Sequence, residues 1–231
     1  MIKRTKKVMA ALMVAIMMIT TSYTVFAAEN DGWTEAPYTE AAQGGAWEAW
    51  CEKWETIKND WTQLSITPGK NATELNFAWY SEKEETLPKV KISKSTDMSN
   101  SIEFDGTQSR AVTNKETKIE YVSNKVTVTG LEEDTTYYYS YGNNENWSSP
   151  VVINTQSTDS FSFFLVGDPQ IGSSLKNTPT GETEAIGQDR SVRNDSFNWN
   201  NTIKKALSLV PNVSFMISAG DQISIRDKKA N

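Results

Sequence analysis

Apolar side chains recur on one side of a predicted helix near the start of the chain. Trp47, Trp50, Trp54, Ile57 and Trp61 follow one another at spacings of three, four, three and four residues, which is the repeat of an amphipathic helix. The stripe has two interpretations, an aromatic platform for sugars or a helix packed by its indoles on the next domain. We favour packing, because a regular stripe is its usual signature.

After this helix the period changes to the short runs typical of β-strands. The runs are rich in Thr, Val, Tyr and Ile, and turn sequences such as PGKN, GTQS and EED separate them. Several such strands over about 95 residues predict an antiparallel β-sandwich. The runs lie at residues 61–67, 73–81, 89–93, 117–131 and 135–142.

One corner of the predicted sandwich has a distinctive sequence. Leu131, Thr135 and Tyr137 have the spacing L-x-x-x-T-x-Y, which resembles the corner of fibronectin type III sandwiches. There the tyrosine hydroxyl bonds to the backbone of a nearby loop. The fibronectin pattern usually has proline where this chain has Glu133.

A polar linker at residues 154–160 separates these strands from a second pattern. FSFFLV, at 161–166, and VSFMIS, at 213–218, are continuous apolar runs, the kind that parallel strands buried on both faces need. A helical pattern lies between them, so the sequence predicts a strand, a helix and a second parallel strand.

The helix predicted between these strands covers residues 194–212. Asp195 or Ser196 is its expected N-cap, and Pro211 is expected to end it. We expect no regular element at 173–193, which is rich in Gly, Thr and Asn. The apolar face of the helix consists of Trp199, Ile203, Ala206, Leu207 and Val210.

The first 27 residues have the pattern of a secretory signal peptide. Four basic residues precede an uncharged apolar run of 12 residues, Val8–Ile19, and Val25 and Ala27 occupy the small-residue positions of a cleavage site. This run is too short to span a bilayer as a helix. We therefore expect a secreted or cell-surface protein with no stable membrane span after the signal peptide is removed.

Net charge and cysteine content limit which partners and which disulfides the exported chain can have. Removal of residues 1–27, which hold four basic and no acidic residues, takes the net charge from −6 to −10. A chain this acidic is a poor partner for nucleic acid or an anionic membrane. The single cysteine, Cys51, allows no intrachain disulfide, and its place in the tryptophan stripe predicts buried packing.

Candidate metal ligands follow both predicted parallel strands. Asp168 comes after Gly167, and Asp221 comes after Gly220. A right-handed crossover brings both carboxylates to one edge of the sheet, and we expect the glycines to allow sharp turns there. Carboxylates within about 4–6 Å repel each other, and a divalent cation between them converts repulsion into coordination. A single Gly-Asp pair is ordinary turn chemistry, but its repetition favours a metal site.

These motifs resemble a known enzyme family. FLVGDPQIG and SFMISAGDQI are similar to the first two metal-binding blocks of calcineurin-like metallophosphoesterases. The strand-rich region before them resembles the fibronectin-like N-terminal domain of purple acid phosphatases, especially secreted bacterial members. The resemblance implies a β-sandwich followed by the start of an α/β metallophosphoesterase domain. The expected division is a signal peptide at 1–27, a Trp-rich helical segment at 28–60, the N-terminal domain at 61–156 and an incomplete metallophosphoesterase domain at 157–231.

The resemblance also implies a reaction and its cofactors. A dinuclear centre, with ions of the Fe, Zn or Mn class, would hydrolyse phosphate monoesters. By position, Asp168 would be a terminal ligand of the first metal, and Asp221 would bridge both metals. Many relatives have histidine where this chain has Gln170, which we expect to be a weak ligand or to orient a water. Ser224 replaces the tyrosine that colours plant and mammalian members, so we expect no purple colour.

The later blocks of the family are missing, and the chain has no histidine. We therefore expect the N-terminal portion of an exported phosphoesterase, with no catalytic histidine block and little or no activity alone. The alternative is a non-catalytic extracellular binding module that uses the Trp-rich helix and the sandwich. A nucleotide-binding domain is disfavoured, because no glycine-rich phosphate loop opens a helix.

Overall fold

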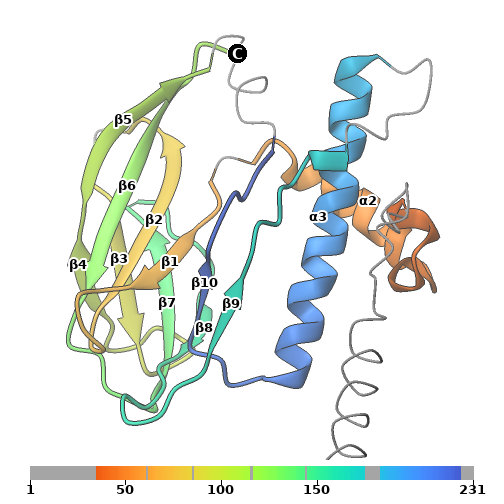
Figure 1. The fold of residues 1–231 in the computed structure, drawn as a ribbon. Helices are drawn as coiled ribbons and strands as arrows, with labels where there is room; N and C mark the ends of the chain where they lie inside the picture. The colour runs from red at the N-terminus through yellow and green to blue at the C-terminus, as the bar shows by residue number, and fades with distance from the viewer. Residues whose placement is uncertain are drawn as a thin grey trace, which may run out of the picture.

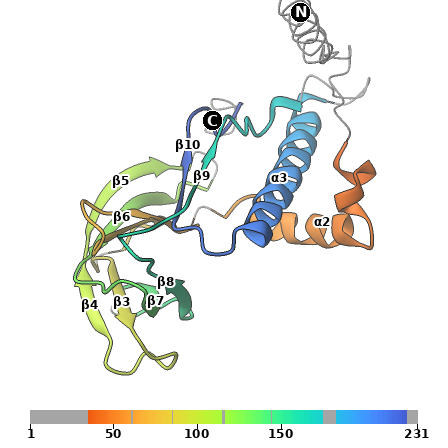
Figure 2. The ribbon, with the colours of Figure 1, turned by 60° about the horizontal axis from the view of Figure 1, so that its bottom comes forward.

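The computed structural model describes residues 35–60, 62–84, 86–114, 117–143, 145–174 and 183–224. The predicted signal peptide, residues 1–27, and Trp61 of the predicted stripe lie outside these ranges. Across the molecule, a sandwich of strands is followed by a parallel strand pair, a long helix and a shorter helix (Figures 1 and 2). None of the helices described here is long and apolar enough to cross a membrane.

Two antiparallel four-stranded sheets form the predicted β-sandwich. One sheet has the strand order β1-β2-β6-β5, and the other has the order β4-β3-β7-β8. The strands are β1 (Ser65–Pro68), β2 (Leu75–Glu82), β3 (Lys89–Ser93), β4 (Ile102–Asp105), β5 (Thr107–Thr113), β6 (Glu120–Val128), β7 (Thr136–Gly142) and β8 (Val151–Asn154).

The chain passes from one sheet to the other at Gly106, where the sequence predicts only a turn. The predicted GTQS turn is therefore wrong, because its last three residues begin β5. A β-carbon on Gly106 would lie 2.4 Å from the carbonyl oxygen of Lys125. The crossing thus requires glycine at this position, because the backbone comes close to β6. In the sequence this glycine is indistinguishable from the glycine of a turn.

Alternating side chains of both sheets fill the space between them. Phe77 and Tyr139 make an edge-to-face ring contact with centroids 5.3 Å apart, a geometry that aromatic pairs prefer. Their burial supplies the main free energy that holds the sheets together. The buried core consists of Phe77, Trp79, Val90, Ile92, Val126, Val128, Leu131, Tyr137 and Tyr139.

The predicted tyrosine corner is present. The Tyr137 hydroxyl oxygen accepts a hydrogen bond from the backbone N–H of Glu132 at 2.9 Å. Leu131, one residue earlier, is buried in the sandwich core. The corner therefore connects the loop before β7 to the core, as the fibronectin-like spacing predicts.

The Trp-rich helix α2 (Ala46–Ile57) packs on the long helix α3 (Glu184–Leu209) rather than on the sandwich. The Trp47 and Trp50 rings lie 5.3 and 6.0 Å from the Phe197 ring. The Trp54 indole N–H donates to Asp189 at 3.4 Å. Packing by the indoles is confirmed, and the partner is a helix more than a hundred residues later in the chain. Two short 3-10 helices, η1 (Ala36–Tyr38) and η2 (Glu40–Ala42), precede α2.

Helix α3 begins ten residues earlier than the sequence predicts. Its N-cap is Thr183, whose hydroxyl accepts from the Ile186 N–H at 3.4 Å, so the N-cap prediction at Asp195 or Ser196 is wrong. The first half escapes recognition because its buried side, which includes Ser191 and Asn194, is polar and lacks the apolar period used to detect helices.

The two strands around α3, β9 (Phe163–Val166) and β10 (Phe215–Ser218), form a parallel pair. The predicted strand, helix and strand are confirmed. Burial on both strand faces is wrong for the described residues, because Leu165 and its register partner Ile217, which share one face, are 68% and 44% exposed. No described layer covers this side of the pair, so a complete metallophosphoesterase domain is not shown.

Candidate metal site at the ends of the parallel strands

Asp168 and Asp221 lie on the loops that directly follow β9 and β10. Because the strands are parallel, both loops leave the same edge of the sheet. Backbone hydrogen bonds join the loops: the Gln170 N–H donates to the Asp221 carbonyl at 3.1 Å, and the Ile171 N–H donates to the Gln222 carbonyl at 3.1 Å. The structure thus brings the predicted ligands onto neighbouring, paired loops.

Close approach, rather than an unusual turn, explains the glycine before Asp221. A β-carbon built on Gly220 would lie 1.4 Å from Asp168 Oδ1. Any side chain at position 220 would therefore displace the Asp168 carboxylate from the turn that carries Asp221. Close approach does not explain the first glycine, because a β-carbon on Gly167 meets no atom within 4 Å.

The backbone of Gln170 links the loop that carries Asp168 to the loop that carries Asp221. Its φ is +43°, a left-handed conformation that is uncommon for residues other than glycine. The Gln170 N–H donates to the Asp221 carbonyl, and Gln170 is exposed to solvent. Its role as a metal ligand therefore remains a prediction from the sequence.

Asp195 holds the first loop against α3. Its Oδ2 atom accepts from the Gly172 N–H at 2.8 Å and from the Ser174 N–H at 3.2 Å. Hydrogen bonds to an ionised carboxylate are stronger than neutral ones. Sequence reasoning assigned Asp195 to a helix cap, and no local signal connects it with a loop more than twenty residues earlier.

The described residues near these loops include no cluster of metal-binding side chains. Asp168 and Asp221 are both exposed, and the described residues contain no group of three or more His, Cys, Asp or Glu side chains that could hold a metal ion. Carboxylate and amide oxygens suit hard cations such as Mg²⁺ or Mn²⁺. The described residues do not, however, form a metal centre, and the roles of Asp168 and Asp221 as ligands stay predictions.

Comparison with protein families assigns the sandwich. Residues 61–155 match the family model of the purple acid phosphatase N-terminal domain, which confirms the resemblance found in the sequence for this part of the chain. The match covers less than half of the 231 residues. No curated protein matches the chain.

Solved structures give weaker similarities. Purple acid phosphatase PPD1 from yellow lupin (Lupinus luteus) seeds aligns with a TM-score of 0.40 and 13% identity, over 68% of this chain and 34% of the lupin chain. This chain therefore spans about a third of that protein. Vertebrate Astrotactin-2 aligns with a TM-score of 0.29 and 14% identity, over 62% of this chain and 28% of its own. The starch-binding domain of Rhizopus oryzae glucoamylase aligns with a TM-score of 0.23 and 15% identity, over 43% and 94% respectively.

Proposed function

From the purple acid phosphatase N-terminal domain at residues 61–155, we propose that this chain belongs to an exported, metal-dependent phosphoesterase. The complete centre would hold two metal ions and act on phosphate monoesters. Within this chain, Asp168 and Asp221 are the proposed metal ligands, with Gln170 as a weaker third. One observation carries the proposal: the loops after β9 and β10 are paired, and the Asp168 carboxylate lies against Gly220, next to Asp221.

The proposal assigns the two parts of the chain different roles. The sandwich has its own core and needs no metal to explain its fold. The edge of the parallel pair carries the carboxylates, which lie where open α/β sheets bind ligands. The described residues do not fit a dinuclear centre. Asp168 and Asp221 would hold a single hard cation whose remaining ligands are water.

Titration with Mn²⁺ tests the metal assignment directly. We expect one bound ion per chain by calorimetry or by electron paramagnetic resonance. Asp168→Asn and Asp221→Asn should each lower the affinity about tenfold or more, since each removes a charged ligand. Asp159→Asn, which changes an exposed aspartate before β9, is the matched control. Absence of binding, or equal affinity in all variants, would refute the assignment.

An activity assay tests the reaction separately. With two carboxylates and one amide, we expect negligible turnover of an aryl phosphate by this chain. Substantial turnover that is lost in Asp168→Ala or Asp221→Ala would contradict this expectation and would show that the chain is a sufficient enzyme.

The tryptophan platform of the alternative binding module is not supported. Trp54 is 6% exposed, and the Trp50 indole N–H donates to the Arg193 carbonyl at 3.1 Å. Trp47 contacts Phe197, as described above. The three indoles are thus turned to α3, and a binding role for the sandwich has to come from another surface.

A further inference from the structure

A polar residue interrupts the buried column of β6. Along this strand Val122, Asn124, Val126 and Val128 all face the inside of the sandwich and are buried, and Asn124 is only 2% exposed. A carboxamide in an apolar column costs free energy unless its polar atoms are hydrogen-bonded. A buried polar residue is therefore a more informative feature than the valines around it.

Asn124 belongs to a polar ladder that crosses three strands. Its Nδ2 atom donates to Ser81 Oγ on β2 at 2.9 Å, and its Oδ1 atom accepts from Gln108 Nε2 on β5 at 3.2 Å. The Gln108 carboxamide oxygen makes no hydrogen bond with other described residues. Both polar atoms of the Asn124 side chain are therefore hydrogen-bonded, and the Gln108 side-chain oxygen can accept a hydrogen bond from a ligand.

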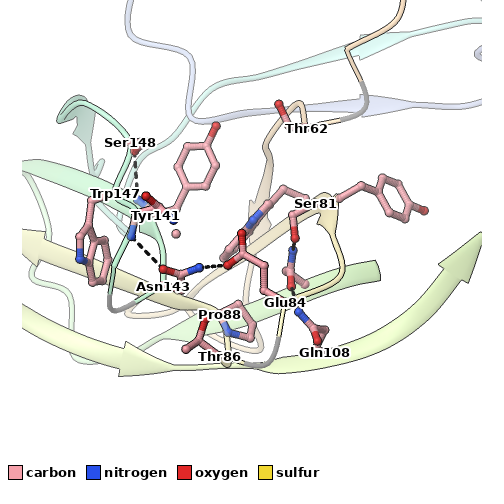
Figure 3. A pocket seen from close by; sticks show the side chains of 15 residues that line it. Thr62, Ser81, Glu84, Thr86, Pro88, Gln108, Tyr141, Asn143, Trp147 and Ser148 are labelled. Atoms are coloured by element: carbon pink, nitrogen blue, oxygen red, sulfur yellow. Dashed lines mark hydrogen bonds between the residues drawn. The ribbon is translucent and has the colours of Figure 1, made fainter. Parts of the chain in front are cut away.

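A cavity of about 240 Å³ opens beside this ladder, between the ends of β2 and β7. Figure 3 shows Glu84 in its centre, with Asn143 and Trp147 on one side and Ser81 and Gln108 on the other. Trp79 and Tyr141, whose rings lie 5.2 Å apart edge to face, supply aromatic surface. The cavity thus combines aromatic rings with planar hydrogen-bonding groups.

Asn143 positions the carboxylate at the cavity. Its Oδ1 atom accepts from the backbone N–H groups of Glu145 and Asn146 at 2.9 and 2.8 Å. These bonds orient its Nδ2 atom, which donates to Glu84 Oε2. The other Glu84 carboxylate oxygen has no partner among the described residues, so it is free to accept from a ligand.

We propose that this cavity binds a neutral, hydroxyl-rich ligand the size of one sugar ring. Glu84 and Gln108 would accept hydrogen bonds from hydroxyl groups, and the half-buried Tyr141 and Trp147 rings would contact the apolar side of the ring. Its volume is below the range of about 300–1,000 Å³ typical of drug-sized ligands, which favours a single ring. The proposal is independent of the metal site, because it uses none of the same residues.

The charge of the cavity excludes phosphorylated ligands. None of the described residues lining it is a lysine or an arginine, and Glu84 adds a negative charge. Lys91 lies over the Trp147 ring but does not line the cavity, and Glu103 pairs with it at 3.3 Å. A ligand phosphate would therefore meet a carboxylate and no cation from the described lining residues. This predicts discrimination between a sugar and its phosphate.

Nuclear magnetic resonance of the protein with single sugars tests the proposal. The probes are glucose, galactose, mannose and N-acetylglucosamine, with glucose 6-phosphate as the anionic counterpart. We expect at least one neutral sugar to shift the indole N–H signals of Trp79 and Trp147 and to leave those of Trp47, Trp50 and Trp54 unchanged. Glucose 6-phosphate should cause no shift at the same concentration.

Matched variants test whether the sugar binds in this cavity. Glu84→Ala and Gln108→Ala should each weaken sugar binding about tenfold, the effect of losing one good hydrogen bond. Glu82→Ala, at an exposed position outside the cavity, should bind as the wild type does. The proposal is overturned if no neutral sugar shifts the Trp79 and Trp147 signals, if the phosphate binds equally well, or if both cavity variants keep full affinity.

Discussion

At the scale of single residues, the hydroxyl of Tyr137 contributes a hydrogen bond whose effect on stability can be measured. Replacing Tyr137 with phenylalanine keeps the buried ring and removes the acceptor of the Glu132 N–H. We expect Tyr137→Phe to lower the free energy of unfolding of the sandwich by about 1 kcal/mol, the usual net value of one hydrogen bond. Urea unfolding measures it. Tyr138→Phe, which alters the neighbouring residue outside the buried core, is the control and should change stability by much less.

Gly220 offers a second test at this scale, because its hydrogen atom leaves room for the Asp168 carboxylate. Gly220→Ala should reduce Mn²⁺ affinity about as much as removal of Asp168, since the new methyl group occupies the place of Oδ1. Gly167→Ala is the matched control, because a methyl group there meets open space. Equal Mn²⁺ affinity in the two glycine variants would contradict this account of the site.

Glu133, where the fibronectin pattern usually has proline, connects the sandwich corner to the linker before β9. Its carboxylate accepts from the Thr158 hydroxyl and from the Thr158 N–H. These two bonds, the hydroxyl first, hold the pKa of Glu133 below its ordinary value. The ionised form is thus favoured in the folded state.

The sign of the resulting pH dependence follows from this direction. A carboxyl whose pKa is lower in the folded protein stabilises it above the unfolded pKa, about 4.3 for glutamate, and this contribution is lost as the pH falls through the folded pKa. We expect Glu133→Gln to unfold at a lower urea concentration than the wild type at pH 7, with the difference shrinking towards pH 3. Glu52→Gln, on the exposed side of α2, is the matched control and should change the urea midpoint at pH 7 by much less than Glu133→Gln does.

At the scale of elements, the contact between α2 and α3 includes one buried aromatic side chain of α3, Phe197. Phe197 is 2% exposed and packs with Ala36, Ala42, Trp47 and Trp50. Phe197→Ala should therefore destabilise this contact by about 3–5 kcal/mol, the usual cost of deleting a buried aromatic ring.

Hydrogen exchange distinguishes a local effect from a global one. In Phe197→Ala the backbone amides of α2 should exchange faster, while those of β2 and β6 keep their protection, because the sandwich core is a separate cluster. Leu209→Ala, at a position of the same helix that is 71% exposed, should leave α2 protected. Faster exchange throughout the sandwich would show that the two regions are coupled.

At the scale of the whole molecule, the described residues form two separate buried clusters. One lies inside the sandwich and the other between α2, α3 and the segment before α2. Regions with separate cores open with separate free energies. We expect denaturant unfolding to show two transitions, one in the helical circular dichroism signal and one in the strand signal.

Two variants assign these transitions. Val126→Ala removes buried volume from the sandwich alone and should shift the strand transition, whereas Phe197→Ala should shift only the helical transition. Coincident transitions that both variants shift together would show a single cooperative unit.

The local patterns of the sequence predicted much of this fold. Short runs rich in Thr, Val, Tyr and Ile between turn sequences predicted the sandwich. The three-and-four spacing predicted α2, and the Leu131–Tyr137 pattern predicted the tyrosine corner. Each depends on residues close together in the chain, where period and spacing directly reflect which side chains share a face. The same locality placed Asp168 and Asp221 after two strands and identified the family of residues 61–155.

Only the tertiary structure decided which distant segments meet. It showed that α2 packs on α3, that the chain crosses between sheets at Gly106, that Asp195 holds a loop rather than caps a helix, and that Gly220 makes room for Asp168. The ladder from Ser81 through Asn124 to Gln108 likewise joins three strands. These contacts join residues far apart in sequence, and they depend on sheet order and helix docking, which no local period encodes.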